Sequence, residues 1–149
     1  MATGWIATLM DVLGDLLKAN AGVVAIVGAK AFPMGTVVDE TRPYVTFALP
    51  LGDQSGHLLG SNEPYMECVR FQVDGWTTTY TGAAQLMDAI FSCLDGAELT
   101  VTGWGKCRIE GDGGTTIEDD PLAESGAGVV GGVTAFRGRR RYKTLLVRG

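Results

Sequence analysis

Histidine and cysteine, which often bind metals or take part in catalysis, are scarce in this sequence of 149 residues. It contains one histidine, His57, and three cysteines, Cys68, Cys93 and Cys107, with no C-x-x-C pair among them. That pattern excludes both a disulfide framework and a zinc site as the basis of the fold. We therefore expect the three cysteines to be reduced, partly buried small hydrophobes.

Long apolar runs are missing as well. The longest apolar stretch, residues 21–27, is far shorter than the roughly 20 residues that a membrane helix needs. No basic leader precedes an apolar segment at Met1. With 46% hydrophobic and 19% charged residues, the chain suits a single domain over residues 1–149. We expect a soluble protein that contacts no membrane and is not exported by the usual secretory route.

No set of catalytic or ligand-binding groups stands out. His57 lies in a Gly- and Ser-containing stretch without a recognisable nucleophile nearby. Residues 126–131 match the dinucleotide fingerprint G-x-G-x-x-G, but they follow Asp119-Asp120-Pro121 instead of a strand, which favours a loop. Asp112 and the acids at 118–120 lack the spacing of a calcium loop. We therefore predict no catalytic residue, cofactor or metal site, and no enzyme activity.

Charge is distributed unevenly along the chain. The net charge is −5, yet the last 13 residues contain no acid and six cations: Arg137, Arg139, Arg140, Arg141, Lys143 and Arg148. The rest of the chain therefore carries −11, which is −5 less the six positive charges. Such polarity suits a protein whose copies meet head to tail. A basic strand that grips the phosphates of a nucleic acid is the competing interpretation.

Hydrophobic periodicity predicts two main helices. The first covers about residues 4–19, with apolar residues at helical spacing and Thr3 available as N-cap. The second follows the threonines 77–79 and carries an apolar stripe that ends at Leu94. The apolar stretch 21–28 could form one further short helix before an extended segment.

Alternating segments predict four strands. Residues 44–49 and 67–74 form an antiparallel hairpin around a long loop at about 51–64. A third strand covers 99–109, with an interruption near Trp104, and a Gly-rich acidic connection at about 111–132 leads to a last strand at 133–147. We therefore expect an α+β fold with one mixed, mostly antiparallel four-stranded sheet packed by two main helices.

The last strand has two distinct faces. Its odd positions form a basic stripe: Arg137, Arg139, Arg141 and Lys143. Phe136, Tyr142 and Leu146 fall on the opposite side, with Arg140 among them. The alternation of strand side chains predicts that the apolar side faces the core.

The order of these segments resembles the tail terminator, or tail completion (head–tail joining), family of long-tailed bacteriophages. Four stretches carry the resemblance: the N-terminal amphipathic helix, residues 26–33 followed by 42–45, residues 69–76 leading into 83–90, and the closing Arg-rich strand. Together they span nearly the whole chain. The Gly-rich acidic connection 111–132 is longer than the pattern of the family.

The resemblance implies a structural virion protein at the head-proximal end of the tail, assembled in the host cytoplasm. It implies a hexameric ring that caps the tail tube, stops its polymerisation and joins the tail to the head connector. The partners would be further copies of the chain, the tail-tube protein and the head–tail connector protein, with DNA only as cargo that passes through the ring. Another phage ring protein, either a head-side connector or a tube subunit, is the alternative.

Two interface hypotheses follow. The basic stripe of one copy would face Glu118, Asp119 and Asp120 of the next copy. The loop at about 51–64 and the connection at about 111–132 would meet the tube and the connector. We place the following residues at these contacts: Asp53, His57, Asn62 and Glu124.

Overall fold

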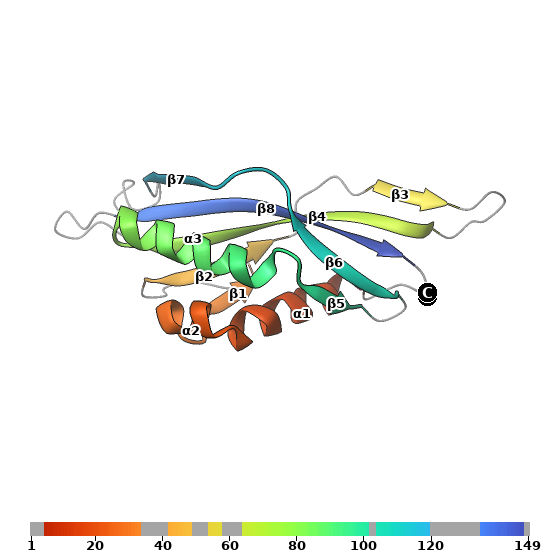
Figure 1. Ribbon diagram of the computed structural model, residues 1–149, viewed down its shortest axis with the longest axis horizontal. Coiled ribbons are helices and arrows are strands. Elements are labelled where there is room, and N and C mark those ends of the chain that lie inside the picture. Colours follow the sequence, from red (N-terminus) through yellow and green to blue (C-terminus); the bar gives the residue numbers. More distant parts are fainter. Residues whose placement is uncertain are drawn as a thin grey trace.

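The structure is a computed structural model, and it describes residues 5–33, 42–48, 54–57, 64–101, 104–119 and 135–147. Its three helices are α1 (Trp5–Ala19), α2 (Ala21–Val27) and α3 (Tyr80–Leu94). Its strands are β1 (Ala31–Pro33), β2 (Tyr44–Ala48), β3 (Gln54–His57), β4 (Pro64–Thr77), β5 (Glu98–Thr100), β6 (Lys106–Gly111), β7 (Thr116–Asp119) and β8 (Phe136–Val147). Figure 1 shows their arrangement.

The strands form one mixed sheet in the order β1-β2-β4-β8-β6-β5. β3 pairs with β4, and β7 pairs with β8, beside this path. Only β1 and β2 are parallel; the other described pairs are antiparallel. The long strands β4 and β8 lie at the centre and run along the longest axis of the molecule (Figure 1), paired from Met66 with Val147 to Thr77 with Phe136.

The α+β class and the mixed, mostly antiparallel sheet are confirmed, but the prediction of four strands was wrong. β3 lies within the expected loop 51–64, and β7 lies within the expected connection 111–132. The expected third strand is a hairpin of β5 and β6, and β1 adds an edge. β1, β3, β5 and β7 have only three or four residues each. Their pairing depends on neighbouring strands, which no local hydrophobic pattern reveals.

Both main helices are confirmed, and α2 is a third helix. In α1, Leu9, Leu13 and Leu17 recur at one-turn spacing and are buried. α2 begins after Asn20, whose side chain accepts the Val23 N–H at 3.1 Å. α3 begins after Thr79, which caps it in the same way. No described helix is long and apolar enough to cross a membrane.

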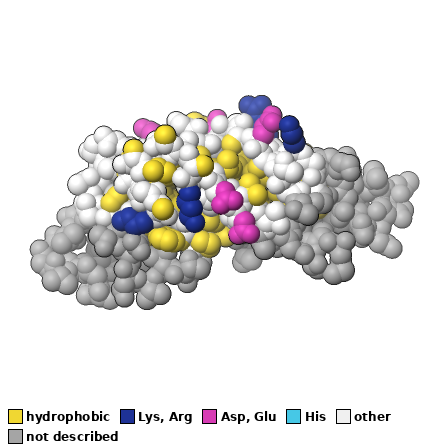
Figure 2. All heavy atoms as spheres, turned by 90° about the horizontal axis from the view of Figure 1, so that it is seen from below, with side chains coloured by type: hydrophobic (Ala, Val, Ile, Leu, Met, Phe, Trp, Pro, Cys, Tyr) yellow, Lys and Arg dark blue, Asp and Glu magenta, His cyan; other side chains and the backbone are white. Residues whose placement is uncertain are grey.

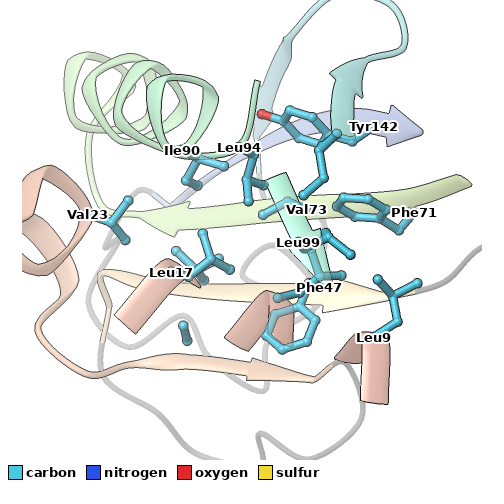
Figure 3. Packing of buried hydrophobic residues seen from close by; sticks show 14 of the residues in the cluster. Leu9, Leu17, Val23, Phe47, Phe71, Val73, Ile90, Leu94, Leu99 and Tyr142 are labelled. Atoms are coloured by element: carbon cyan, nitrogen blue, oxygen red, sulfur yellow. The ribbon is translucent and has the colours of Figure 1, made fainter. Parts of the chain in front are cut away.

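The core lies between the three helices and one face of the sheet. Figure 3 shows Leu17 of α1 and Ile90 of α3 pointing toward side chains of the strands. On the core side of the sheet, Tyr142 stacks on Phe71 with 5.6 Å between the ring centroids. Burial raises the pKa of the Tyr142 hydroxyl. Figure 2 shows the molecule from below, where α1 and α2 lie, and patches of apolar side chains are exposed there beside charged ones.

Two glycines allow α3 to approach the sheet closely. Gly75 of β4 and Gly138 of β8 are cross-strand partners, and both are buried beneath the helix. A Cβ on Gly75 would lie 2.8 Å from Leu86 Cδ2, and one on Gly138 would overlap the buried Met87 side chain. Any larger residue at either position would therefore force the buried Leu86 or Met87 side chain of α3 to shift.

We predict that Gly138→Ala lowers the free energy of unfolding by about 1–3 kcal/mol, because the added methyl overpacks the contact with Met87. Gly114→Ala is the matched control. A Cβ at Gly114 would meet no atom within 4 Å, so a change within about 0.5 kcal/mol is expected. Urea denaturation measures both variants, and equal stability of the two would contradict the close approach of α3.

Candidate interaction surface

One face of the central strand pair points away from the helices and carries charged side chains. On β4, Val69, Phe71 and Val73 are buried in the core, so the residues between them lie on the opposite face. Gln72 lies opposite Arg141, Asp74 opposite Arg139, and Trp76 opposite Arg137. The structure therefore places the whole basic stripe of β8 on the outer face of the sheet.

Arg139 is bound to a buried carboxylate. Its Nε donates to Asp74 Oδ1 at 2.9 Å, and its Nη2 donates to Oδ2 at 3.2 Å. The side chain of Asp74 is fully buried, whereas that of Arg139 is 31% exposed. The hydrogen bond from Arg139 to Asp74 raises the pKa of the guanidinium. This two-pronged contact keeps the buried charge of Asp74 compensated.

Arg137 joins three strands. Its guanidinium forms an ion pair with Glu118, which lies opposite it on β7, and sits 5.7 Å from the ring centroid of Trp76 on β4. Trp76 donates its indole N–H to Thr46 Oγ1 on β2 at 2.9 Å. The hydrogen bond from Arg137, and then its charge, lower the pKa of the Glu118 carboxyl.

Two further arginines are engaged within the chain. Arg70 of β4 lies 3.2 Å from Asp112, measured from Nε to Oδ2. Arg140 lies on the core side of β8, as expected, where its guanidinium stacks 4.0 Å from the ring centroid of Phe91. It also donates to Thr115 Oγ1 at 3.1 Å.

The basic stripe therefore has two unequal halves. Arg137 and Arg139 are paired with carboxylates of the same chain. Arg141 is exposed and Lys143 is half-buried, and neither forms an ion pair with a residue that the structure describes. The half nearer the C-terminus keeps its charge available for another molecule.

The acidic residues of the interface hypothesis are only partly within the described structure. Glu118 lies beside Arg137 of its own chain, and Asp119 ends β7. His57 is the last residue of β3. The remaining predicted residues lie outside the described part: Asp53, Asn62, Asp120 and Glu124.

The cysteines agree with the sequence analysis. Cys107 is buried, Cys68 and Cys93 are half-buried, and all three are free. Burial raises the pKa of the Cys93 thiol. Within the described ranges, no group of three or more His, Cys, Asp or Glu side chains could hold a metal ion.

Sequence reasoning missed the residues that contact Arg137 and Arg139, the paired half of the basic stripe. Asp74 stands at an outward position of an alternating strand, which suggests exposure, and Trp76 follows the alternating segment. Their roles depend on which residue of β8 lies opposite each of them. A carboxylate on a strand followed two residues later by an aromatic residue is too common a pattern to identify this network.

Fold and surface together define an α+β protein with one charged sheet face. The family model of tail completion protein gp17 matches residues 12–120, most of the chain. The chain therefore belongs to the tail completion protein family of bacteriophages. It is a structural tail protein and a component of the virion.

A solved structure has a similar fold. It is a chain from the structure described as "Virion of native gene transfer agent (GTA) particle", with a TM-score of 0.71 and 16% sequence identity over 97% of each chain. No curated protein matches the sequence. At this identity the similarity shows that the two chains share a fold.

We predict that Arg139→Met lowers the free energy of unfolding by about 1–3 kcal/mol, because it leaves the buried carboxylate of Asp74 unpaired. Arg141→Met is the matched control, since it removes a neighbouring cation of the same stripe that has no ion pair with a described residue. Its effect should stay within about 0.5 kcal/mol. Urea denaturation at low protein concentration compares the variants, and equal losses would show that the Asp74 contact contributes nothing.

A second prediction concerns pH. Because Arg137 lowers the pKa of Glu118 in the folded state, this pair stabilises the fold above the unfolded-state pKa of about 4.3. The contribution is lost as the pH falls through the lowered folded-state value. An NMR titration should give Glu118 a pKa below the reference value of about 4.3 for glutamate. In Arg137→Met this pKa should rise. A pKa that is the same in both proteins would refute the pairing.

Proposed function

We propose that this tail completion protein forms a hexameric ring that caps the tail tube, stops its polymerisation and joins the tail to the head connector. The observation that carries the proposal is the match of residues 12–120 to the tail completion family. The charged sheet face supports it. In a ring, each copy needs two different surfaces that complement each other, so that one surface binds the other surface of the next copy. The proposal includes no chemical reaction, and the ring would lie at the head-proximal end of the tail.

The contact between copies would use the basic stripe and the acidic segment that begins in β7. Arg137 and Arg139 already bind Glu118 and Asp74 of their own chain, so they hold the strands in place. Arg141 and Lys143 then supply the charge that meets a neighbour. On the acidic side, Asp119 and Asp120 follow Glu118 in sequence and complete the matching negative segment.

The ends of the molecule would meet the other tail proteins. β3 lies at the opposite end of the central strand pair from β7 (Figure 1). We place Asp53, His57 and Asn62 toward one neighbour, and Glu124 toward the other, with tube and connector as the two neighbours. DNA would pass through the ring as cargo.

The pairings within the chain weigh against a phosphate-binding strand as the main function. Arg70, Arg137 and Arg139 each face a carboxylate. A phosphate would have to displace these carboxylates, and the overall charge of −5 opposes the approach of a duplex.

We predict that the purified protein, added in excess to growing tail tubes, arrests them at short lengths, as electron microscopy would show. A tube subunit would instead lengthen the tubes. In the capped tails, residues 51–64 and 123–132 should become more protected from hydrogen exchange than in the free protein, because docking orders interface loops. Tubes that grow to the same length with and without the protein would refute capping.

We predict further that the double variant Arg141→Glu/Lys143→Glu assembles at least tenfold more weakly, measured by light scattering, because it opposes the acidic segment of the neighbour with like charge. Lys18→Glu is the control, since Lys18 is an exposed cation on α1, away from the stripe. Equal assembly of the double variant and the control would remove the stripe from the interface.

A further inference from the structure

A pocket opens where β6 and β8 diverge. The two strands are paired only from Gly111 with Tyr142 to Ile109 with Thr144, and Thr144 Oγ1 donates to the Arg108 carbonyl at 3.0 Å. Beyond this point β6 turns toward β5, and the two ribbons separate in Figure 1. The gap is a pocket of about 410 Å³, and the lining residues that matter here are Cys68, Lys106, Arg108, Glu110, Lys143 and Leu145.

The chemistry of the pocket suits an anionic segment with an apolar side chain. Its lining includes three cations, Lys106, Arg108 and Lys143, against the single carboxylate of Glu110. None of the three cations forms an ion pair with a residue that the structure describes.

The pocket also has an apolar part. Leu145 is one of the few large hydrophobic side chains that the described structure leaves exposed, at 45%. Cys68, half-buried on the neighbouring strand, pairs in register with Leu145. An apolar side chain placed here would cover surface that water now contacts.

We propose that this pocket binds the acidic segment of a second copy, residues 119–122, with the carboxylates of Asp119 and Asp120 toward Lys106, Arg108 and Lys143 and Leu122 against Leu145. The segment reads Asp-Asp-Pro-Leu, so two acids and one apolar side chain meet the cations and the apolar part of the pocket. The proposal rests on the proposed ring, and it names the parts of two copies that meet. It locates the contact at the unpaired half of the stripe and adds two cations of β6 to it.

The contact must join two copies, because the segment cannot reach the pocket of its own chain. Asp119 lies opposite Phe136 at the start of β8. Leu145 is nine residues further along β8, about 30 Å away at the rise of a strand. Leu122 is three residues from Asp119 and lies at most about 11 Å from it, even in a fully extended chain.

The pocket and Asp119, where the segment begins, therefore lie at opposite ends of β8. A contact between them joins unlike surfaces of two copies and leaves one pocket and one segment open on the pair. Repetition of such a contact adds copies, and it gives a ring where the rotation between neighbouring copies closes. A two-fold dimer would instead need both contacts to form at once.

Cross-linking tests the contact directly. In Leu122→Cys, the new thiol should lie near the native Cys68 of the next copy, so a short bis-maleimide should give covalent dimers and higher multiples on a denaturing gel. The yield should fall at least tenfold in Leu122→Cys/Cys68→Ser. Val24→Cys is the control, because it places an exposed thiol on α2, away from the pocket.

The outcomes separate the pocket from the ring. If light scattering shows assembled rings but Leu122→Cys cross-links no better than Val24→Cys, the pocket contact is wrong while the ring stands. If the protein stays monomeric, self-assembly of the free protein fails, and a labelled peptide of residues 117–125 is then added to the full chain. Binding that falls at least tenfold in Lys143→Glu supports the pocket, and absence of binding overturns it.

A charge swap gives an independent measurement. Lys143→Glu should weaken assembly or peptide binding, and Asp120→Lys in the partner segment should restore at least part of the loss. The effect should shrink in high salt, since the groups lie at the surface. A second substitution that only deepens the loss would contradict the pairing of Lys143 with the acidic segment.

Discussion

The antiparallel pairing of β4 with β8 along their full length is the constraint on which the rest of the structure depends. It brings Phe71 beside Tyr142 on the core side, and Asp74 beside Arg139 on the outer side. A shift of one residue in this register would turn the core side chains of one strand outward and separate Asp74 from its only described cation. Core packing and surface charge are therefore determined by the same set of backbone hydrogen bonds.

The length of this pair also produces the two ends of the molecule. On the edge that faces away from β8, β4 pairs with two strands, β2 and β3. On the edge that faces away from β4, β8 likewise pairs with two strands, β7 and β6. The acidic segment begins where β7 ends, and the pocket lies where β6 leaves β8. Because the end of β7 and the pocket both lie along β8, their separation is fixed, as the proposed head-to-tail ring of identical copies would require.

Two kinds of charge contact serve different purposes here. The buried carboxylate of Asp74 and its partner Arg139 stabilise the pairing within one copy, where loss of either partner leaves a charge uncompensated. The exposed Arg141 and Arg108 and the half-buried Lys143 have no ion pair with a described residue, so they contribute little to the stability of a single chain. In the proposed ring they would provide orientation and selectivity toward a neighbour, where weak contacts of this kind add up.

The sequence by itself determined the elements with strong periodicity and the two-sided last strand. The leucines of α1 and the apolar stripe of α3 predicted their helices, and alternation along 136–146 separated the basic stripe from Tyr142 and Leu146. Tertiary structure alone decided the short strands β3 and β7, the glycine contact beneath α3, and which half of the stripe is neutralised. The reason is that periodicity reports only the side on which a residue lies, whereas the identity of its partner depends on register between segments far apart in the chain.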